Sequence, residues 1–366
     1  MQNRLFRNMC RMRTVVSVFM LTALLSGCWA ISSQGIQTVA SDEGSTSGAQ
    51  TWTNVDIPGL YSPKARSYHS RSMGEWQRPS VTLNAAGVPY VAYGNGRILV
   101  ATFEEGTWVS VGQPITLSGR GAEDHSLALN TAGVPHLAYT ESANDGNRQI
   151  RVMKFEEGVW VSVGSPISVL TVAIGGVFPF LALDAAGVPY VAYSDSLGRE
   201  PRLLSVVRFE GGAWVSMGSP TRLPGWVGFH SLALDATGVP YVAYKNFDTF
   251  KLSVMKFERD AWVPVGSLDF SSKMDYIPPS LALSAAGVPY VVYRNEANRK
   301  LSVMKFEGGS WISLSSPSPK EIAYPSLTLS AAGVPYLAYI DGIHHGRLSV
   351  MKYEKGRWVP VESPGR

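Results

Sequence analysis

Apolar and polar residues alternate in short runs along most of this chain. In "SLAL" at residues 231–234 the two leucines lie on one side of the chain, and in "LSVMKFE" at residues 252–258 Leu252 and Val254 lie opposite Met255. A period of two residues is typical of a half-buried β-strand. Each unit contains four such runs, and no stretch after residue 27 shows a convincing helical period. The pattern therefore predicts an all-β protein built from short strands.

The turns between these predicted strands have a repeated chemistry. Between the first and second runs stands "DATGVP" at residues 235–240 or a close copy of it. Its Asp, Asn or Ser opens a type I turn, its glycine takes a positive φ, and its proline begins the next strand, where a missing N–H does least harm. The residues that open the six turns are Asn84, Asn130, Asp184, Asp235, Ser284 and Ser330. "FEGGAW" at residues 209–214 and similar turns join the third and fourth runs.

The whole unit recurs six times from residue 79 onward. The glycines of the GVP turns are 46 to 54 residues apart and fall at Gly87, Gly133, Gly187, Gly238, Gly287 and Gly333. This period is in the range of β-propeller units, and stacking four-stranded sheets around an axis buries faces that a single sheet leaves exposed. We therefore expect a six-bladed β-propeller of four-stranded antiparallel blades over residues 51–366. The tryptophans that start the fourth runs are expected to pack between blades; they are Trp108, Trp160, Trp214, Trp262, Trp311 and Trp358.

A seventh tryptophan run does not fit this count. "TWTNVDIPG" at residues 51–59 resembles "WVSVGSP" but has no unit of its own. It either adds a fifth outer strand, locks the ring together with "RWVPVESP" at residues 357–364, or belongs to an incomplete seventh blade. These alternatives stay open at the level of the sequence.

The N-terminus has the features of a secretory signal. Four arginines precede an apolar run at residues 14–27, which is shorter than the roughly 20 residues that span a bilayer. "LSGC" at residues 25–28 resembles the lipobox of bacterial prolipoproteins, which implies cleavage before Cys28 and lipidation of its thiol. We therefore expect a signal peptide at residues 1–27, a flexible tether at 28–50, and a protein anchored in the cell envelope. Trp29 after the cysteine implies the outer membrane in a Gram-negative cell; an ordinary cleaved signal would instead imply secretion.

Charge and cysteine content narrow the classes of partner. The chain has 32 basic and 28 acidic residues, and the four N-terminal arginines account for the whole surplus. No clustered basic surface of the kind that binds nucleic acid is expected. Cys28 is the only cysteine after the signal, so no disulfide within the mature chain is possible.

Candidate binding residues lie in the loops after the second strands and in the linkers between units, which vary in length and chemistry. Function commonly resides on variable loops held by a rigid scaffold. Acidic or amide residues always stand two positions after the last tyrosine of the second strand: Asn95, Glu141, Asp195, Asn246, Asn295 and Asp341. They either form a ring of acceptors for sugar hydroxyls or a cation, or cap the turns at the strand ends.

Aromatic and histidine residues outside the repeated positions are further candidates. Trp76 and Trp226 lie in linkers, where they could stack on a sugar ring or pack beneath the linker. His125 and His230 replace the proline that opens the first strand in four other units, either to face a shared ligand or as neutral substitutions. No set of residues has the spacing of a metal site, so neither a metal nor another cofactor is expected.

The "GxPYVAY…VMKF…W" units resemble tandem repeats of bacterial secreted and surface proteins, and this resemblance implies a propeller similar to six-bladed lectins. We expect a non-catalytic, surface-anchored lipoprotein whose variable loops bind a glycan or an envelope protein. Two alternatives remain. One is an envelope assembly scaffold, like the propeller lipoprotein of the outer-membrane assembly machinery. The other is a propeller glycosidase or lyase, although no catalytic motif such as G-x-S-x-G or H-E-x-x-H is present.

Overall fold

The computed structural model describes most of the chain after residue 79. The described ranges are residues 80–84, 88–94, 97–105, 107–117, 124–143, 147–169, 177–195, 203–217, 227–317, 322–330, 332–341 and 347–360. The signal, the tether and the run at 51–59 lie outside these ranges, so those predictions stay predictions. Within them, the chain forms 26 strands in six antiparallel sheets.

Each sheet corresponds to one sequence unit and is called a blade here. Blade 1 contains β1 (Ser80–Leu83), β2 (Pro89–Tyr93), β3 (Arg97–Glu104), β4 (Thr107–Ser110) and the short β5 (Ile115–Thr116), which also pairs with β3. Blade 2 contains β6 (His125–Leu129), β7 (Pro135–Ser142), β8 (Arg148–Glu156), β9 (Val159–Ser162) and β10 (Ile167–Val169). Blade 3 contains β11 (Phe180–Leu183), β12 (Pro189–Asp195), β13 (Leu203–Glu210) and β14 (Ala213–Ser216).

The other three blades have four strands each. Blade 4 contains β15 (Val227–Leu234), β16 (Pro240–Asn246), β17 (Leu252–Glu258) and β18 (Ala261–Pro264). Blade 5 contains β19 (Ser280–Leu283), β20 (Pro289–Arg294), β21 (Leu301–Glu307) and β22 (Ser310–Leu314). Blade 6 contains β23 (Ile322–Leu329), β24 (Pro335–Asp341), β25 (Arg347–Glu354) and β26 (Arg357–Pro360).

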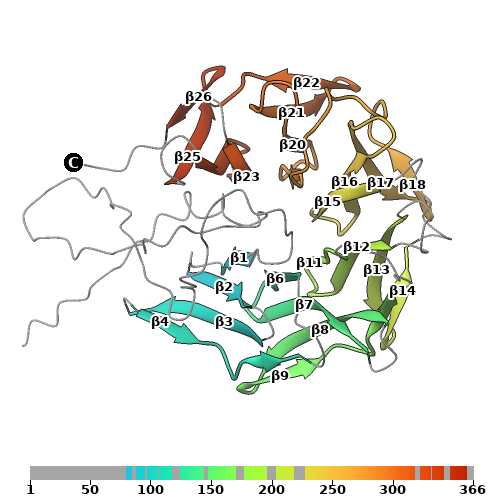
Figure 1. Cartoon of the computed structure of the whole chain (residues 1–366), viewed down its shortest axis with the longest axis vertical. Helices are drawn as coiled ribbons and strands as arrows, with labels where there is room; N and C mark the ends of the chain where they lie inside the picture. The colour runs from blue at the N-terminus through green and yellow to red at the C-terminus, as the bar shows by residue number, and fades with distance from the viewer. Residues whose placement is uncertain are drawn as a thin grey trace, which may run out of the picture.

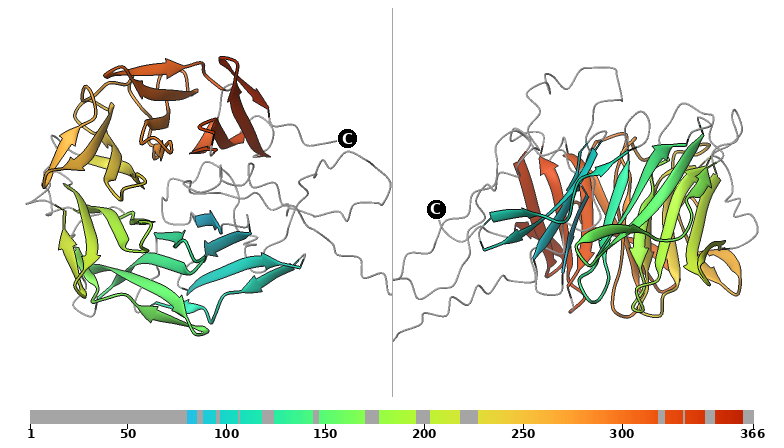
Figure 2. Two further views of the ribbon diagram at one scale, coloured as in Figure 1. Left: turned by 180° about the vertical axis from the view of Figure 1, so that it is seen from behind. Right: turned by 90° about the horizontal axis from the view of Figure 1, so that it is seen from below.

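The six blades are arranged around a common axis (Figure 1). The first strands lie nearest the axis and the short tryptophan strands lie at the outer edge, as the view from behind also shows (Figures 1 and 2). The predicted all-β, six-bladed propeller is confirmed.

The turn between the first and second strands is built as its sequence predicts. In blade 2 the backbone N–H of Gly133 donates to the carbonyl of Asn130 at 2.9 Å, and Gly133 has a φ of 79°. The side-chain Oδ1 of Asn130 accepts hydrogen bonds from the backbone N–H groups of Ala132 and Val134 at 3.0 and 2.9 Å. An Asx side chain thus satisfies two amides that the turn would otherwise leave unpaired.

The tryptophan of one blade packs against the outer strand of the preceding blade. The indole Nε1 of Trp160 donates to the carbonyl of Val111 at 3.0 Å, and Trp262 and Trp311 make the same bond to Met217 and Val265 at 2.8 and 2.7 Å. The ring of each of these tryptophans is also inclined at 55° to 61° to that of the phenylalanine five residues before it, with ring centroids 5.4 to 5.5 Å apart. The predicted packing role is therefore observed directly at these three positions.

A second set of contacts joins the blades near the axis. The backbone N–H of Leu127 in blade 2 donates to the hydroxyl of Ser80 in blade 1 at 2.8 Å. The equivalent bonds run from Leu181 to Ser126, from Leu281 to Ser231 and from Leu327 to Ser280, at 3.0, 3.2 and 3.0 Å. In blade 3 Phe180 takes the position of the serine, so this connection changes between blades 3 and 4.

In blades 1, 2 and 4, the glycine two residues after the outer strand lies under the aromatic rings of the next blade. A Cβ atom added to Gly266 would lie 2.6 Å from the Phe306 ring, whereas one added to Gly309 would meet nothing within 4 Å. Both glycines have a positive φ, 72° and 81°, so the backbone strain of an alanine is similar at the two positions.

We expect Gly266→Ala to reduce the free energy of unfolding by about 1–3 kcal/mol more than Gly309→Ala, because only the first substitution overpacks a blade boundary. Urea unfolding of the two variants beside the wild type measures the difference. Equal losses would show that the aromatic rings do not need the space above Gly266.

Candidate functional site

The two ends of the propeller differ in how much their loops vary from blade to blade. Because the strands alternate in direction, the two short repeated turns of each blade lie at one end. The loops after the second strands and the linkers between blades lie at the other end, called the variable face here (Figure 2). In blade 4 this face includes the loop at residues 247–251 and the linker at residues 267–279.

The two histidines predicted as a ligand-facing pair are buried between blades. His125 is 8% exposed and its Nε2 lies 3.0 Å from the carbonyl oxygen of Ala92 in blade 1. His230 is 1% exposed, with Nε2 3.3 Å from the carbonyl of Ala192 and Nδ1 3.3 Å from the hydroxyl of Ser194. Each histidine therefore joins its blade to the preceding one, in place of the proline found in other units.

Burial governs the protonation of both rings. It lowers the pKa of His125, and it lowers the pKa of His230 to about 4, in each case against a partly compensating backbone hydrogen bond. Both side chains are neutral at pH 7 and act as hydrogen-bonding parts of the core.

Three members of the predicted acceptor ring have described side chains, and each is engaged within the protein. Glu141 forms an ion pair with Arg151 and accepts a hydrogen bond from Gln149 at 2.6 Å. The Oδ1 atoms of Asn246 and Asn295 accept hydrogen bonds at 2.9 Å from backbone amides two residues further on. Both asparagines therefore cap the turns at the ends of their strands, which is one of the two roles that the sequence predicts for this set.

The other predicted site residues are described by their backbone alone or lie outside the described residues. Asp195 and Asp341 are described only as the last backbone positions of β12 and β24. The candidates outside the described residues are Cys28, Trp76, Asn95 and Trp226.

An aromatic cluster occupies the variable face where blades 3, 4 and 5 meet. Its members are Phe178, Phe229, Phe247, Phe250 and Tyr276. Phe229 is central: its ring centroid lies 6.1 Å from Phe178, 5.9 Å from Phe247 and 6.2 Å from Tyr276. Phe247 in turn lies 6.4 Å from both Phe250 and Tyr276. The phenylalanines are half-buried, whereas Tyr276 is 58% exposed, so the cluster presents an aromatic surface to solvent.

A buried lysine lies beneath this cluster. Lys245, in β16, is 0% exposed, and its Nζ lies 4.0 Å from the ring centroid of Tyr276, 4.9 Å from Phe250 and 5.2 Å from Phe247. Nζ also donates to the backbone carbonyl of Asp275 at 3.4 Å. Burial lowers the pKa of Lys245, while Glu296 and Asp275 oppose that shift. Cation–π contacts of this kind attract an ammonium group to the ring faces and help to fix the rings around it.

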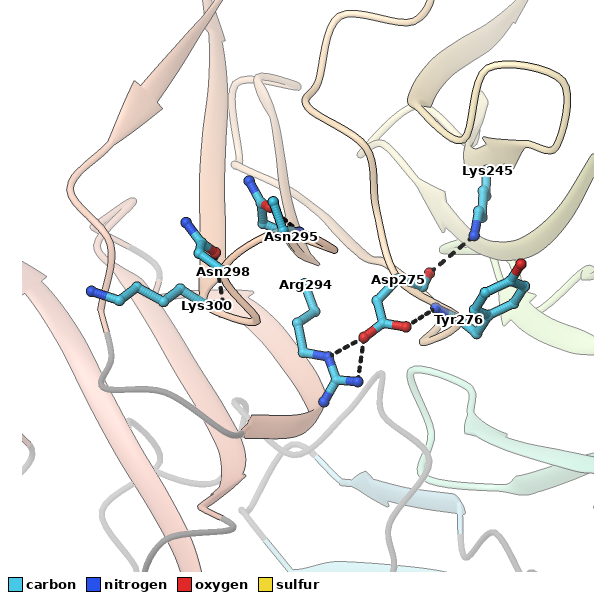
Figure 3. A network of polar contacts seen from close by, with 8 residues as sticks. Lys245, Asp275, Tyr276, Arg294, Asn295, Asn298 and Lys300 are labelled. Carbon is cyan, nitrogen blue, oxygen red and sulfur yellow. Dashed lines mark hydrogen bonds and ion pairs between the residues drawn. The ribbon is translucent and has the colours of Figure 1, made fainter. Parts of the chain in front are cut away.

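An ion pair holds the exposed tyrosine over the lysine. The Oδ2 atom of Asp275 accepts from Arg294 Nε at 2.9 Å and pairs with a second guanidinium nitrogen, and its Oδ1 accepts from the backbone N–H of Tyr276 at 2.6 Å. Figure 3 shows Arg294 reaching Asp275 from one side and Lys245 pointing at its carbonyl from the other. Tyr276 therefore stands on a linker that is anchored to blades 4 and 5 at once.

Three cluster members have an unfavourable backbone conformation. Phe178, Phe229 and Phe250 have φ values of 47°, 41° and 61°, in the left-handed region that bulky residues rarely adopt. Such residues cost about 1–3 kcal/mol each and concentrate at functional sites. Next to Phe229 the pairing of β15 with β16 shifts register between Gly228 and His230, which turns the phenylalanine toward the cluster.

Two equivalent positions in the repeated units point to this cluster, whereas the variable loops considered separately do not. Phe178 and Phe229 occupy the same position in two successive units, two residues before the place of the axial serine. Arg78, Asp124, Pro278 and Tyr324 stand there in the other four units. A repeated aromatic substitution in neighbouring blades thus marks two side chains that meet on one face.

Two kinds of feature are absent from the described residues. Within those ranges, no three His, Cys, Asp or Glu side chains lie so that they could hold a metal ion. The same part of the chain contains no helix long and apolar enough to cross a membrane.

No protein-family model and no curated protein matches the chain. Among solved structures, it is similar to a polysaccharide lyase, an ulvan lyase bound to -[GlcA(1-4)Rha3S]-, with 11% identity and a TM-score of 0.53 over 78% of this chain and 80% of that one. It is also similar to AofleA from Arthrobotrys oligospora, with 13% identity and a TM-score of 0.51 over 79% and 87% of the two chains. A mutant Aleuria aurantia lectin in complex with alpha-methyl-L-fucoside has 14% identity and a TM-score of 0.49 over 79% and 96%. Identities this low show the propeller fold alone, and the lectin, with its lower score, adds nothing further.

The burial of His230 predicts a pH-dependent stability. The imidazole has a pKa of about 4 in the folded chain and 6.5 in the unfolded one, so its contribution is complete above pH 6.5 and is lost as the pH falls toward 4. We expect His230 to account for about 2 kcal/mol of the stability lost between pH 7 and pH 5. Urea unfolding of wild type and His230→Gln at both pH values measures this share. Identical pH dependence in the two proteins would contradict it.

Proposed function

We propose that this chain is a non-catalytic binding module of the bacterial cell envelope that holds a carbohydrate ring on the aromatic cluster of its variable face. The observation that carries the proposal is the convergence of five aromatic side chains from three successive blades, three of which face Lys245, with Tyr276 58% exposed at their surface. The three left-handed phenylalanines support it, because strain at those positions has no evident use for the fold.

The chemistry of the cluster suits a sugar. An aromatic side chain offers a large rigid face for the apolar C–H face of a pyranose, and polar groups beside it can bind the hydroxyls. Lys273 lies at the edge of the cluster, with Nζ 5.7 Å from the ring centroid of Phe250. Exposed Glu296 adjoins it, since the Glu296 amide donates to the Lys273 carbonyl at 2.9 Å. A stacking face with donors and acceptors at its rim is thus available.

The acidic groups of this region favour binding over hydrolysis. A glycosidase needs a carboxylic acid whose pKa is raised enough to protonate the leaving oxygen. Burial alone would raise the pKa of Asp275, but hydrogen bonds from the Tyr276 amide and from Arg294 outweigh it and leave the pKa below its usual value. Asp275 is therefore better suited to holding the linker than to donating a proton.

The binding proposal predicts a loss of affinity on removal of the exposed ring. Tyr276→Ala is expected to weaken glycan binding about tenfold or more, equivalent to about 1.4 kcal/mol, because the stacking face is lost. Detergent-extracted full-length protein on a glycan array, followed by calorimetry with the best ligand, measures the effect. Val159→Ala, a change at a 56% exposed residue of the outer strand β9, is the matched control and should bind as the wild type does.

Two other results would redirect the proposal. Binding that survives Tyr276→Ala would place the sugar elsewhere on the protein. Absence of any glycan signal, together with an envelope protein that co-purifies with wild type but not with Tyr276→Ala, would favour the assembly-scaffold alternative on the same surface.

We further propose that the module is tethered to a membrane through Cys28. The support for this is the "LSGC" sequence after a basic and apolar leader. Cys28→Ala should move the protein from the membrane fraction to the soluble fraction and abolish labelling with a fatty-acid analogue. Unchanged membrane retention would exclude the lipid anchor, and the substitution should leave glycan binding unaltered.

A further inference from the structure

The boundaries of blades 1 and 2, 3 and 4, and 4 and 5 share one construction. The preceding blade supplies a donor half, and the following blade supplies a receiving half. At the boundary of blades 1 and 2, the preceding blade supplies Val111, three residues after Trp108, whose carbonyl accepts the indole N–H of Trp160. The following blade supplies a receiving half that includes Leu137, Tyr139 and Met153 together with that tryptophan. The bonds of Trp262 and Trp311 repeat this arrangement.

Blade 1 also has a receiving half, on its side away from blade 2. Val91, Tyr93 and Ala101 are 3%, 4% and 4% exposed and form a separate apolar cluster, against which Leu99 and Trp108 pack. Val91, Tyr93, Ala101 and Trp108 stand in the positions that Leu137, Tyr139, Met153 and Trp160 hold in blade 2. The described members of this cluster all come from blade 1, so no other described blade covers it. The buried Nε1 of Trp108, like those of Trp214 and Trp358, has no hydrogen-bond partner among the described groups.

The described strands of blade 6 and blade 1 lack the contact between first strands that joins the other neighbouring blades. Consecutive first strands pack side by side, from β1 with β6 to β19 with β23. Among the described strands, β23 and β1 are not such a pair. Figure 1 shows the sheet of β23–β26 and the sheet of β1–β4 separated by more space than any two consecutive blades. The receiving half of blade 1 therefore needs a donor half from another part of the chain.

The sequence before blade 1 contains a matching donor half. In residues 51–59, a tryptophan, a valine three residues later and a proline six residues later are Trp52, Val55 and Pro58. Trp160, Val163 and Pro166 have the same spacing in blade 2. Residues 60–79 connect this segment to β1, and 20 extended residues reach up to about 66 Å, more than enough to place the segment beside the sheet that follows.

We propose that residues 51–59 dock on the receiving half of blade 1 as the outer strand of a partial seventh blade, with the Val55 carbonyl accepting the indole N–H of Trp108. The sequence leaves three roles open for this tryptophan run, and the proposal selects the incomplete seventh blade. Asp56 stands where Gly112 and Gly266 lie in other blades. Ser315 occupies that place in blade 5 and donates from its hydroxyl to the Gly356 carbonyl of blade 6 at 3.4 Å, so a side chain is accommodated there.

The test compares two deletions of equal length in the full chain. Deletion of residues 51–58 is expected to lower the melting temperature by about 5–10 °C, because an apolar blade face loses its cover. Deletion of residues 42–49, in the tether, is the matched control and should leave the melting temperature unchanged. Equal melting temperatures in both variants would overturn the proposal and assign the cover to blade 6.

Rescue in trans tests the register of the docked segment. A synthetic peptide of residues 50–60 should restore the melting temperature of the 51–58 deletion, and the same peptide with Trp52→Ala should not. Equal rescue by both peptides would overturn the proposed docking, and so would a shift to dimers by light scattering that restores stability without peptide, since a second copy would then be the occupant.

A readout without a deletion covers the case in which the shortened chain does not fold. The Trp108 indole N–H, assigned by its disappearance in Trp108→Phe, should exchange slowly with solvent in the wild type and at least tenfold faster in Trp52→Ala. Equal exchange rates would overturn the proposal. Because glycan binding at Tyr276 involves blades 3 to 5, that activity is independent of either outcome.

Discussion

The contact between a tryptophan and the outer strand of the preceding blade is the interaction on which this propeller depends. An isolated four-stranded sheet cannot bury both faces, and the indole supplies a large apolar surface together with one directional bond. Near the axis, the serine-to-amide bonds fix the same boundaries at their inner end. At the boundaries of blades 1 and 2 and of blades 4 and 5, both bonds are present, one near the axis and one at the outer edge. The loops can vary there without shifting the strands that support them.

One boundary departs from this repeated construction at its inner end. Between blades 3 and 4, Phe180 replaces the axial serine and its ring lies 5.1 Å from that of His230, edge to face. The aromatic cluster and Lys245 lie on the variable face of the same boundary. The tryptophan bond from Trp262 to Met217 is kept there, but aromatic and polar side chains replace the axial serine-to-amide bond. This combination makes the region chemically unlike the rest of the ring.

The sequence predicts the features that all six units share well, and the features that single units have alone poorly. The strands, the Asx turns and the packing of Trp160, Trp262 and Trp311 follow from local spacing, since six copies report the same environment. His125 and His230 stood out as departures, but spacing does not show that they bond to carbonyls of another blade. Lys245 has the sequence context of a surface loop, yet the linker carrying Tyr276 covers it. Which loop folds over which strand depends on contacts between units, and no single unit encodes them.

The short outer strands have a consequence for how molecules of this protein meet one another. An unpaired strand edge is a template for pairing with a second molecule, and exposed Val109, Val159, Val215 and Ile312 lie on these edges. Strands of four or five residues give such pairing little length. Beside them, ion pairs occupy the ends of the third strands: Lys154–Glu156, Arg208–Glu210, Lys256–Glu258, Lys305–Glu307 and Lys352–Glu354. A second sheet could add to the edge only by stripping water from these charges, so the repeated unit that builds the ring also protects it from edge-to-edge aggregation.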